Sequence, residues 1–284
     1  MIPAAFDYVT PKSVPEAIAE LVKHGQEAKV LAGGHSLIPL MKLRLSTPSF
    51  LVDIGRIPNL NYIREADGQL AVGAMTTHHD IELSELVQKK VPVLSKAAAR
   101  IGDPQVRNRG TIGGAAAHAD PNGDFPACLV ALDAEFVATG PRGDRTIKAQ
   151  DFFVETFSSA LQPDEVLREI RVPAAPDAKA AYMKFSRRSQ DWAIVAVAAQ
   201  ANVKDGRVQS LRVGLTAMGP RPVRAQAVEK ALQGQAVDKE RIRSAAEQAA
   251  EGTQPPEDLN GSPDYRRHLA KVLTRRALEE ILTV

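Results

Sequence analysis

The sequence contains one cysteine, Cys128, among 284 residues. One thiol cannot form a disulfide within the chain, and it cannot hold an iron–sulfur cluster, which takes about four protein ligands, usually cysteines. A Cys-x-x-Cys zinc site and a His-Glu-x-x-His motif are also missing. Redox or metal chemistry therefore has to come from a bound cofactor or from partner proteins, and no metal ligand is expected in this chain.

Histidine is scarce and scattered, with six residues of which only His78 and His79 are adjacent. The pair follows Thr76-Thr77, which is a typical helix-capping sequence, and adjacent residues of a helix point in different directions. We therefore interpret the pair as a solvated helix start rather than as a metal site. A Gly-x-Ser-x-Gly nucleophile motif is missing too, and no catalytic residue is predicted.

An excess of charge of one sign is lacking as well, since 36 Lys and Arg residues face 34 Asp and Glu residues. Basic residues are not clustered with aromatic ones, so nucleic acid is not an expected partner. The longest apolar run, Trp192 to Ala199, is far shorter than the roughly 20 residues that cross a membrane. The N-terminal residues do not resemble a signal peptide. These features predict a globular protein of the cytoplasm.

Apolar periodicity and turn residues predict a mixed α+β chain. In the first half, Ser13 has the spacing of a helix N-cap, and Gly25 ends the helix that follows. Asp67-Gly68 is a hairpin signal between two short strands. Strands are expected at residues 29–31, 50–54, 62–64, 70–72, 135–139, 145–148 and 166–172, and helices at residues 14–24, 36–45, 77–87 and 92–101.

Composition changes at Val172-Pro173-Ala174-Ala175-Pro176, which is the best candidate for a domain boundary. Beyond it, two long strands at residues 193–203 and 208–216 flank the turn signal Asp205-Gly206, and three helices follow at residues 223–232, 239–251 and 263–282. We therefore predict an N-terminal domain of residues 1–175, with subdomains of about 1–54 and 55–175, and a C-terminal domain of residues 176–284.

Two glycine-rich loops are the most informative features of the sequence. Each comes before a predicted helix start, where free backbone N–H groups and the helix dipole favour an anion. Glycine has no Cβ that would hold a phosphate away from the backbone, and Ser36 and Thr111 can donate a hydroxyl hydrogen bond to a phosphate oxygen. The first loop consists of Ala32, Gly33, Gly34, His35 and Ser36. The second runs from Arg109-Gly110 through Thr111, Ile112, Gly113, Gly114 and Ala115.

Each loop taken alone indicates little, because a Gly-Gly pair is more often a tight turn. Neither loop matches the Gly-x-Gly-x-x-Gly dinucleotide motif or the phosphate loop of nucleotide triphosphatases. Two such loops that meet in space would cradle a pyrophosphate. The residues by themselves therefore predict a phosphate-bearing cofactor and leave its identity open.

Longer stretches around both loops resemble a known family. Residues 32–45 and 103–114 resemble the two flavin loops of the medium subunit of aerobic carbon monoxide dehydrogenases, within the molybdenum hydroxylase (xanthine dehydrogenase) family. The resemblance extends from Met1-Ile2-Pro3 through Gly73-Ala74-Met75-Thr76 to Asp264-Tyr265-Arg266 and covers essentially the whole chain. It implies a vanillyl-alcohol-oxidase-like (PCMH-type) FAD-binding domain of two α+β subdomains, plus a C-terminal α+β domain that covers the flavin ring.

The resemblance also implies cofactor-binding residues. The two glycine loops match those that hold the FAD pyrophosphate. Asp124 matches an aspartate near the ribose or ribityl hydroxyls, although a helix N-cap before Phe125 is an equal alternative. Lys184 matches a lysine near the cofactor, with a surface lysine at a strand end as the alternative. Asp191 and Trp192 match a segment against the isoalloxazine, while the commoner role of a lone tryptophan beside an apolar run is core packing.

The implied function is that of an FAD-containing electron-transfer subunit. The molybdenum cofactor would lie on a large partner subunit and the [2Fe-2S] clusters on a small one, in a dimer of heterotrimers. Electrons would leave FAD for an external acceptor such as a quinone, in the cytoplasm or at the inner face of the membrane through the partners.

Two departures from the family pattern weaken carbon monoxide as the substrate of the complex. Ala115 stands where Asn or Asp is typical, and the chain reads Ser189-Gln190-Asp191-Trp192 where family members often have Gly-Asp before the aromatic residue. Related complexes that hydroxylate aldehydes, purines or N-heteroaromatic rings are therefore alternatives. A self-sufficient flavin oxidase and a flavin-free scaffold of the same fold are further ones.

Overall fold

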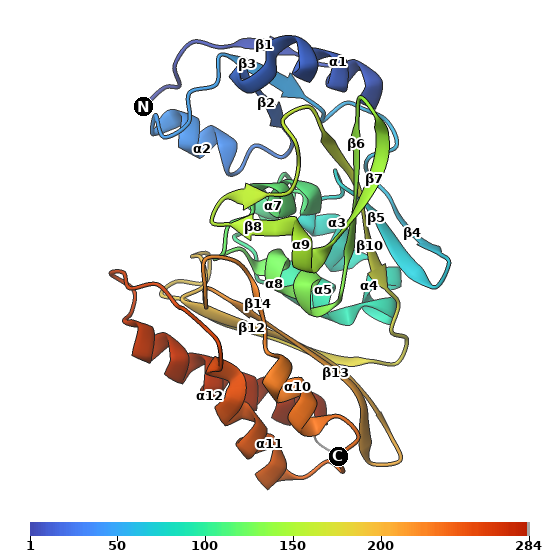
Figure 1. Cartoon of the computed structure of the whole chain (residues 1–284), viewed down its shortest axis with the longest axis vertical. Coiled ribbons are helices and arrows are strands. Elements are labelled where there is room, and N and C mark those ends of the chain that lie inside the picture. Colours follow the sequence, from blue (N-terminus) through green and yellow to red (C-terminus); the bar gives the residue numbers. More distant parts are fainter. Residues whose placement is uncertain (283–284) are drawn as a thin grey trace.

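The computed structural model describes residues 1–282, which form three parts stacked along the long axis of the molecule (Figure 1). The N-terminal part is a parallel sheet in the order β1-β3-β2, with helix α1 packed against it. Ser13 caps α1 by accepting a hydrogen bond from the Glu16 amide. The elements are β1 (Asp7–Val9), α1 (Val14–His24), η1 (Gly25–Glu27), β2 (Ala28–Leu31), α2 (Leu37–Lys42) and β3 (Phe50–Asp53).

The middle part is an antiparallel sheet in the order β4-β5-β10-β6-β7, packed against short helices. Asp67 and Gly68 both have positive φ angles, as the tight β4–β5 turn requires. The elements are β4 (Ile63–Ala66), β5 (Gln69–Gly73), α3 (His78–Leu83), α4 (Glu85–Lys90), α5 (Pro92–Ala98), α6 (Pro104–Arg107), α7 (Ile112–His118), α8 (Asp124–Ala131), β6 (Glu135–Gly140), β7 (Gly143–Lys148), α9 (Ala149–Phe152), β8 (Phe153–Glu155), β9 (Ser158–Ser159) and β10 (Val166–Pro173).

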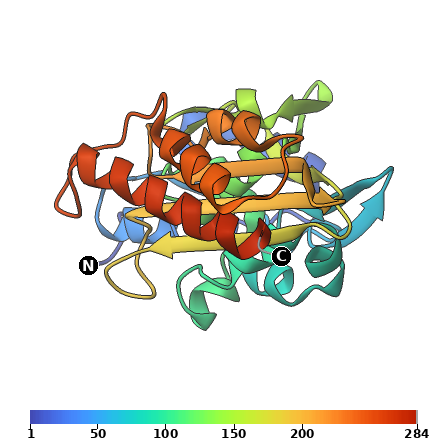
Figure 2. The same cartoon turned by 90° about the horizontal axis from the view of Figure 1, so that it is seen from below.

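The C-terminal part is an antiparallel sheet in the order β11-β12-β13-β14, and helices α10, α11 and α12 cover one face of it (Figure 2). The turn signal at Asp205-Gly206 joins β12 to β13 as predicted. The elements are β11 (Lys179–Phe185), β12 (Val195–Lys204), β13 (Arg207–Thr216), β14 (Val223–Arg224), α10 (Gln226–Leu232), α11 (Lys239–Glu247), η2 (Gln248–Ala250) and α12 (Pro263–Leu282).

Strand β12 is apolar along most of its length because both of its faces are buried. Ala196 and Ala198 pack into the core of the middle part, whereas Val195 and Val197 pack under the C-terminal helices. Successive side chains of a strand point to opposite faces, so residues 195–201 of this strand are apolar except for the buried Gln200. The C-terminal sheet therefore lies directly on the middle part. The face of the sheet that carries Ala196 and Ala198 completes the core of the middle part.

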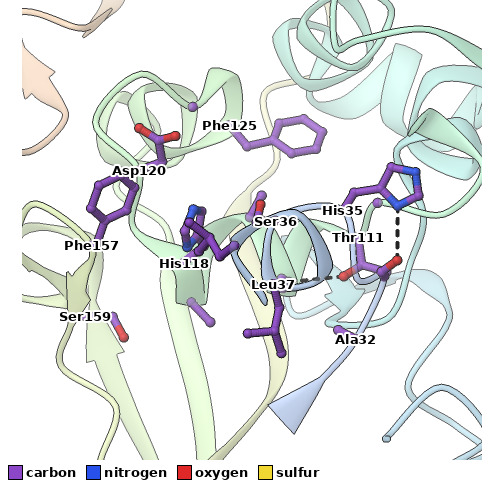
Figure 3. A pocket seen from close by; sticks show the side chains of 18 of the residues that line it. Ala32, His35, Ser36, Leu37, Thr111, His118, Asp120, Phe125, Phe157 and Ser159 are labelled. Atoms are coloured by element: carbon purple, nitrogen blue, oxygen red, sulfur yellow. Dashed lines mark hydrogen bonds between the residues drawn. The ribbon is translucent and has the colours of Figure 1, made fainter. Parts of the chain in front are cut away.

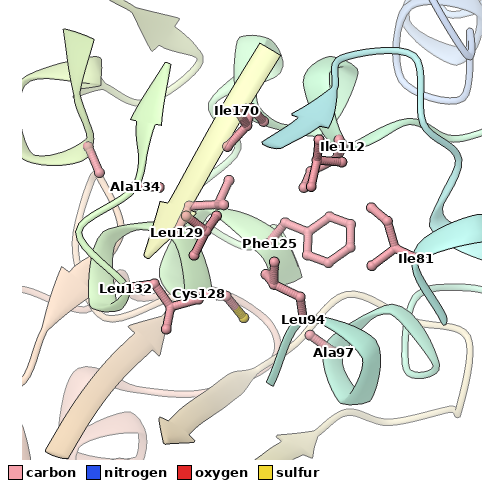
Figure 4. Packing of buried hydrophobic residues seen from close by; sticks show 14 of the residues in the cluster. Ile81, Leu94, Ala97, Ile112, Phe125, Cys128, Leu129, Leu132, Ala134 and Ile170 are labelled. Atoms are coloured by element: carbon pink, nitrogen blue, oxygen red, sulfur yellow. The ribbon is translucent and has the colours of Figure 1, made fainter. Parts of the chain in front are cut away.

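The core of the middle part gathers side chains from α3, α5, α7, α8 and the central strand β10 (Figure 4). Cys128 lies in this core with no exposed surface, and burial raises the pKa of its thiol well above the usual range. A thiol in this state is a poor nucleophile and a poor metal ligand.

The α+β architecture is confirmed, while five predicted helices differ in extent. The helix at 92–101 ends at Ala98. The predicted helix at residues 77–87 is two helices, because Ser84 adopts an extended conformation and caps α4. The helix at 36–45 ends at Lys42, and the helix at 239–251 ends at Glu247 before a 3-10 turn. The helix at 223–232 begins at Gln226, since Val223 and Arg224 pair with β13 instead. No helix within residues 1–282 is long and apolar enough to span a membrane.

Candidate functional site

A cavity of about 1410 Å³ lies where the three parts of the molecule meet. Its volume exceeds the roughly 300–1,000 Å³ of common small-molecule pockets, which suits a long ligand. Residues of both glycine loops surround it (Figure 3). The predicted site residues that line it are Ala32, Gly33, Gly34, His35, Ser36, Thr111, Gly113, Gly114, Ala115, Asp124, Asp191 and Trp192. Ile112 and Lys184 lie behind this wall, with Ile112 in the hydrophobic core.

The two glycine loops touch each other at Gly33. A Cβ on Gly33 would lie 2.2 Å from the carbonyl oxygen of Arg109, so no other residue fits there without moving the second loop. Gly114 faces the first loop from the other side, with its Cβ position 3.7 Å from Cβ of Ala32. The two loops, which are far apart in sequence, therefore meet in space.

The first loop offers free amide groups to the cavity. Within residues 1–282, no hydrogen bond uses the backbone N–H of Gly33, Gly34, His35 or Ser36. Gly34 has a φ of 79°, a left-handed conformation that glycine adopts without strain. His35 turns its Nδ1 back to the Gly33 carbonyl at 3.2 Å. This loop therefore has the donors that an oxyanion needs.

The second loop differs, because the protein itself uses its amides. The N–H groups of Ile112 and Gly113 donate to the carbonyls of Thr76 and Ala74 at 3.0 and 2.9 Å. The N–H of Gly114 donates to Thr111 Oγ1 at 3.1 Å, which caps α7. The expectation of free amides is thus wrong for this loop. It retains the proton of the Thr111 hydroxyl as a donor, since that oxygen only accepts from Gly114.

Asp124 lies at the start of α8 with both carboxylate oxygens occupied. One oxygen accepts from the hydroxyl of Tyr182, and the other is 2.9 Å from Nζ of Lys184. Lys184 also donates to the carbonyl of Arg100 at 3.1 Å. Burial raises the pKa of Asp124, and the Lys184 charge and both hydrogen bonds offset part of that rise.

This arrangement rules out two alternatives. Gly123 is the N-cap of α8, and the Asp124 side chain makes no capping hydrogen bond. The Lys184 side chain is 2% exposed, so it is not a surface lysine. The two residues instead join α8 to β11 across the boundary between the middle and C-terminal parts.

Trp192 lies in the connection between β11 and β12 and lines the cavity. Its side chain is 58% exposed, so the alternative of a core tryptophan is wrong. Asp191 is its neighbour on the same wall, and its amide donates to the Arg188 carbonyl at 3.1 Å. The indole is therefore open to contact with a ligand in the cavity.

Sequence reasoning missed several residues that line the cavity. His78 does start a helix, with Thr77 as its N-cap, but it is 5% exposed and lines the wall, so the expectation that it is solvated is wrong. His118 and Phe157 also line the cavity and form an aromatic contact, with ring centroids 5.0 Å apart (Figure 3). Burial lowers the pKa of His118, which favours its neutral form. A single histidine or phenylalanine carries no local motif, and only the fold brings these residues to the loops.

Two family models together match nearly all of the sequence. Residues 4–175 match the FAD binding domain in molybdopterin dehydrogenase, and residues 180–281 match the CO dehydrogenase flavoprotein C-terminal domain. This chain belongs to the molybdopterin dehydrogenase flavoprotein family. The resemblance found in the sequence is confirmed, and FAD is the cofactor of the matched domain. The division between residues 175 and 176 and the roles of single residues stay predictions.

Relatives within the family match this chain over nearly its whole length. The carbon monoxide dehydrogenase medium chain of Hydrogenophaga pseudoflava is 45% identical over 98% of this chain and 97% of its own. The glyceraldehyde dehydrogenase medium chain of Sulfolobus acidocaldarius is 37% identical over 99% of this chain and 100% of its own. A solved carbon monoxide dehydrogenase from H. pseudoflava, without the Mo-pyranopterin moiety, superposes with a TM-score of 0.96 and 46% identity, covering 99% of this chain and 98% of that one.

Proposed function

We propose that this chain binds FAD in the cavity between its three parts and serves as the electron-transfer subunit of a carbon-monoxide-dehydrogenase-like complex. The observation that carries the proposal is the contact between the two glycine loops at the wall of one large cavity. Free amides on one loop and a free hydroxyl proton on the other are suited to a pyrophosphate. Bound FAD would accept and release electrons, and the protein would supply position and electrostatics.

Most of the predicted site residues have a task in this proposal. The amides of Gly33 to Ser36 and the Thr111 hydroxyl donate to phosphate oxygens. Asp124, held by Lys184 and Tyr182, orients the hydroxyls between the phosphates and the ring. Asp191 and Trp192 contact the ring from the C-terminal part. Ile112 acts indirectly, because its burial in the core fixes the start of α7.

Partner subunits complete the redox chain in this proposal. The only cysteine, Cys128, is buried in the core, and residues 1–282 hold no cluster of His, Cys, Asp and Glu suited to a metal. We therefore assign the [2Fe-2S] clusters to a small subunit and the molybdenum cofactor to a large one, in a dimer of heterotrimers. Electrons pass from the clusters to FAD and on to an external acceptor such as a quinone, in the cytoplasm or at the inner membrane face.

A reconstitution experiment tests this division of labour. The full chain freed of cofactor should bind FAD, yet it should not reduce a dye when substrate is added. Addition of the small and large subunits should restore substrate-dependent dye reduction. Turnover by this chain alone would support the self-sufficient oxidase instead, and failure of the wild-type chain to bind FAD would support the scaffold.

Carbon monoxide is the substrate that we propose for the complex. Its support is the identity to the Hydrogenophaga medium chain, 45%, against 37% for the glyceraldehyde dehydrogenase medium chain. The substrate itself would bind to the large subunit. The test is therefore dye reduction by the assembled complex with carbon monoxide, aldehydes, purines and N-heteroaromatics offered in parallel. Activity with an aldehyde and none with carbon monoxide would move the assignment to the related hydroxylases.

A further inference from the structure

His78 is the first residue of α3, and its imidazole is held in place from several sides. Its backbone N–H donates to the carbonyl of Gly110 at 2.9 Å, which ties α3 to the second glycine loop. The imidazole packs edge-on against Phe125, with ring centroids 5.1 Å apart. It is 5% exposed, and it is one of the residues that line the cavity.

The two ring nitrogens of His78 have different surroundings. Nδ1 is buried and has no hydrogen-bond partner in the described part of the chain. Nε2 lies next to the α-carbon of Gly110, since a Cβ added to Gly110 would lie 2.6 Å from Nε2. No hydrogen bond of the imidazole to another residue is found within residues 1–282 either. Nε2 is therefore the nitrogen that remains available to a ligand in the cavity.

The imidazole is neutral near pH 7 and carries one proton. Burial, together with the nearby charges of His35 and Arg107, lowers the pKa of His78 to about 4. Buried N–H groups without an acceptor are rarer in proteins than acceptors without a donor. The proton therefore belongs on Nε2, which makes this side chain a neutral hydrogen-bond donor toward the cavity.

The contact with His78 explains why a glycine stands at position 110. Gly110 lies in the second loop and looks like part of a phosphate-binding sequence. The space next to its α-carbon is filled by the His78 imidazole, which leaves no room for a Cβ. A glycine at this position lets the ring reach the cavity wall beside Thr111.

We infer that His78 is a further cofactor-binding residue, whose Nε2–H donates a hydrogen bond to an oxygen of the phosphate-bearing chain of the cofactor. The inference deepens the proposed function and rests on FAD occupying this cavity. The acceptor is either a phosphate oxygen or a hydroxyl of the chain that links the phosphates to the ring. Both offer the same chemistry, namely an oxygen that accepts from a neutral N–H.

The test compares the affinity of the full chain, freed of cofactor, for FAD across four proteins. His78→Phe keeps a ring against Phe125 and removes the donor, and we expect its Kd to rise about tenfold or more, as for loss of a hydrogen bond to a charged group. His78→Gln places an amide N–H near the former Nε2, and its Kd should stay within about threefold of wild type. His79→Phe is the matched control, because His79 is the neighbouring histidine but does not line the cavity.

Two further measurements keep the test decisive. FMN and ADP, titrated in place of FAD, tell which half of the cofactor loses affinity in His78→Phe. If that variant does not fold, nitrogen-15 NMR on histidine-labelled wild-type chain replaces it, with a shift of the His78 Nε2 signal expected when FAD is added. Folded His78→Phe with wild-type affinity, or an unshifted Nε2 signal, overturns the inference. Wild-type chain that does not bind FAD overturns the proposed function instead.

Discussion

Asp124 and Lys184 form an ion pair inside the protein, with 2.9 Å between Oδ2 and Nζ and side-chain exposures of 1% and 2%. Both members are removed from water, and the Tyr182 hydroxyl occupies the other carboxylate oxygen. The pair joins the first turn of α8 to β11 and thus fixes the C-terminal sheet to the cavity wall. A buried pair of this kind is costly to break on one side, because the remaining charge has no partner.

Lys184→Met is expected to lower the free energy of unfolding by about 3–5 kcal/mol. The double variant Asp124→Asn/Lys184→Met should recover most of that loss, since no unpaired charge is left. Lys179→Met, an exposed lysine on the same strand, is the control and should change stability little. Urea unfolding of the wild type and the three variants measures these changes in the free energy of unfolding. Equal losses in the single and double variants would contradict an ion pair and indicate simple loss of packing.

Gly34→Val and Gly114→Val are expected to purify depleted of FAD. At Gly114, a Cβ would lie 2.8 Å from Thr111 Oγ1 and disturb the donor that faces the phosphate. At Gly34, the positive φ of 79° adds a backbone strain of roughly 1–2 kcal/mol for any β-branched residue. FAD content after purification is the measured quantity, together with the melting temperature.

Gly68→Val is the control that separates loss of FAD binding from backbone strain in Gly34→Val. Gly68 also has a positive φ, 74°, but it lies in the β4–β5 turn with open space around its α-carbon and away from the cavity. The control should lose similar stability and retain FAD, whereas Gly34→Val should lose both. If Gly34→Val retains as much FAD as Gly68→Val, the first loop does not hold the pyrophosphate.

Trp192→Leu is expected to change the flavin and leave the fold almost unaffected. The indole is 58% exposed on the cavity wall, so its loss should alter stability by about 0.5 kcal/mol or less. Loss of an aromatic contact with the ring, about 0.5–1.5 kcal/mol, should alter flavin fluorescence and reduction potential. Phe6→Leu, an exposed aromatic residue away from the cavity, is the control. An unchanged flavin spectrum in Trp192→Leu would place the indole away from the ring.

Stability should fall as the pH decreases from about 6.5 to 4, and His78 should account for about 3 kcal/mol of that fall. The pKa of His78 is depressed to about 4 in the folded chain, so the unfolded chain binds its proton first. The contribution is therefore present above pH 6.5 and lost as the pH drops through 4. Urea unfolding at several pH values should show a shallower dependence in His78→Phe, and an unchanged one in His79→Phe. Parallel curves for wild type and His78→Phe would mean that His78 is not neutral in the fold.

Contiguous sequence was enough to predict the two glycine loops and the strand and helix on either side of the first loop, whereas α6 and α7 beside the second loop lie outside the expected ranges. Ser13 and Gly25 bound α1 as expected, and the turns at Asp67-Gly68 and Asp205-Gly206 join the strands that they were expected to join. These features are local, since a capping hydrogen bond or a positive φ depends on a few neighbouring residues. The resemblance to flavoproteins likewise rested on unbroken stretches around the loops.

The tertiary structure alone decided which donors the loops can offer and which side chains join them. The carbonyls of Ala74 and Thr76 occupy amides of the second loop, and nothing in residues 109–115 indicates this. Asp124 finds its partners Tyr182 and Lys184 on a strand of another part of the chain. In the same way, folding places His78 beside Gly110. Hydrogen bonds and burial between segments distant in sequence depend on how sheets and helices pack, and a local pattern has no access to that packing.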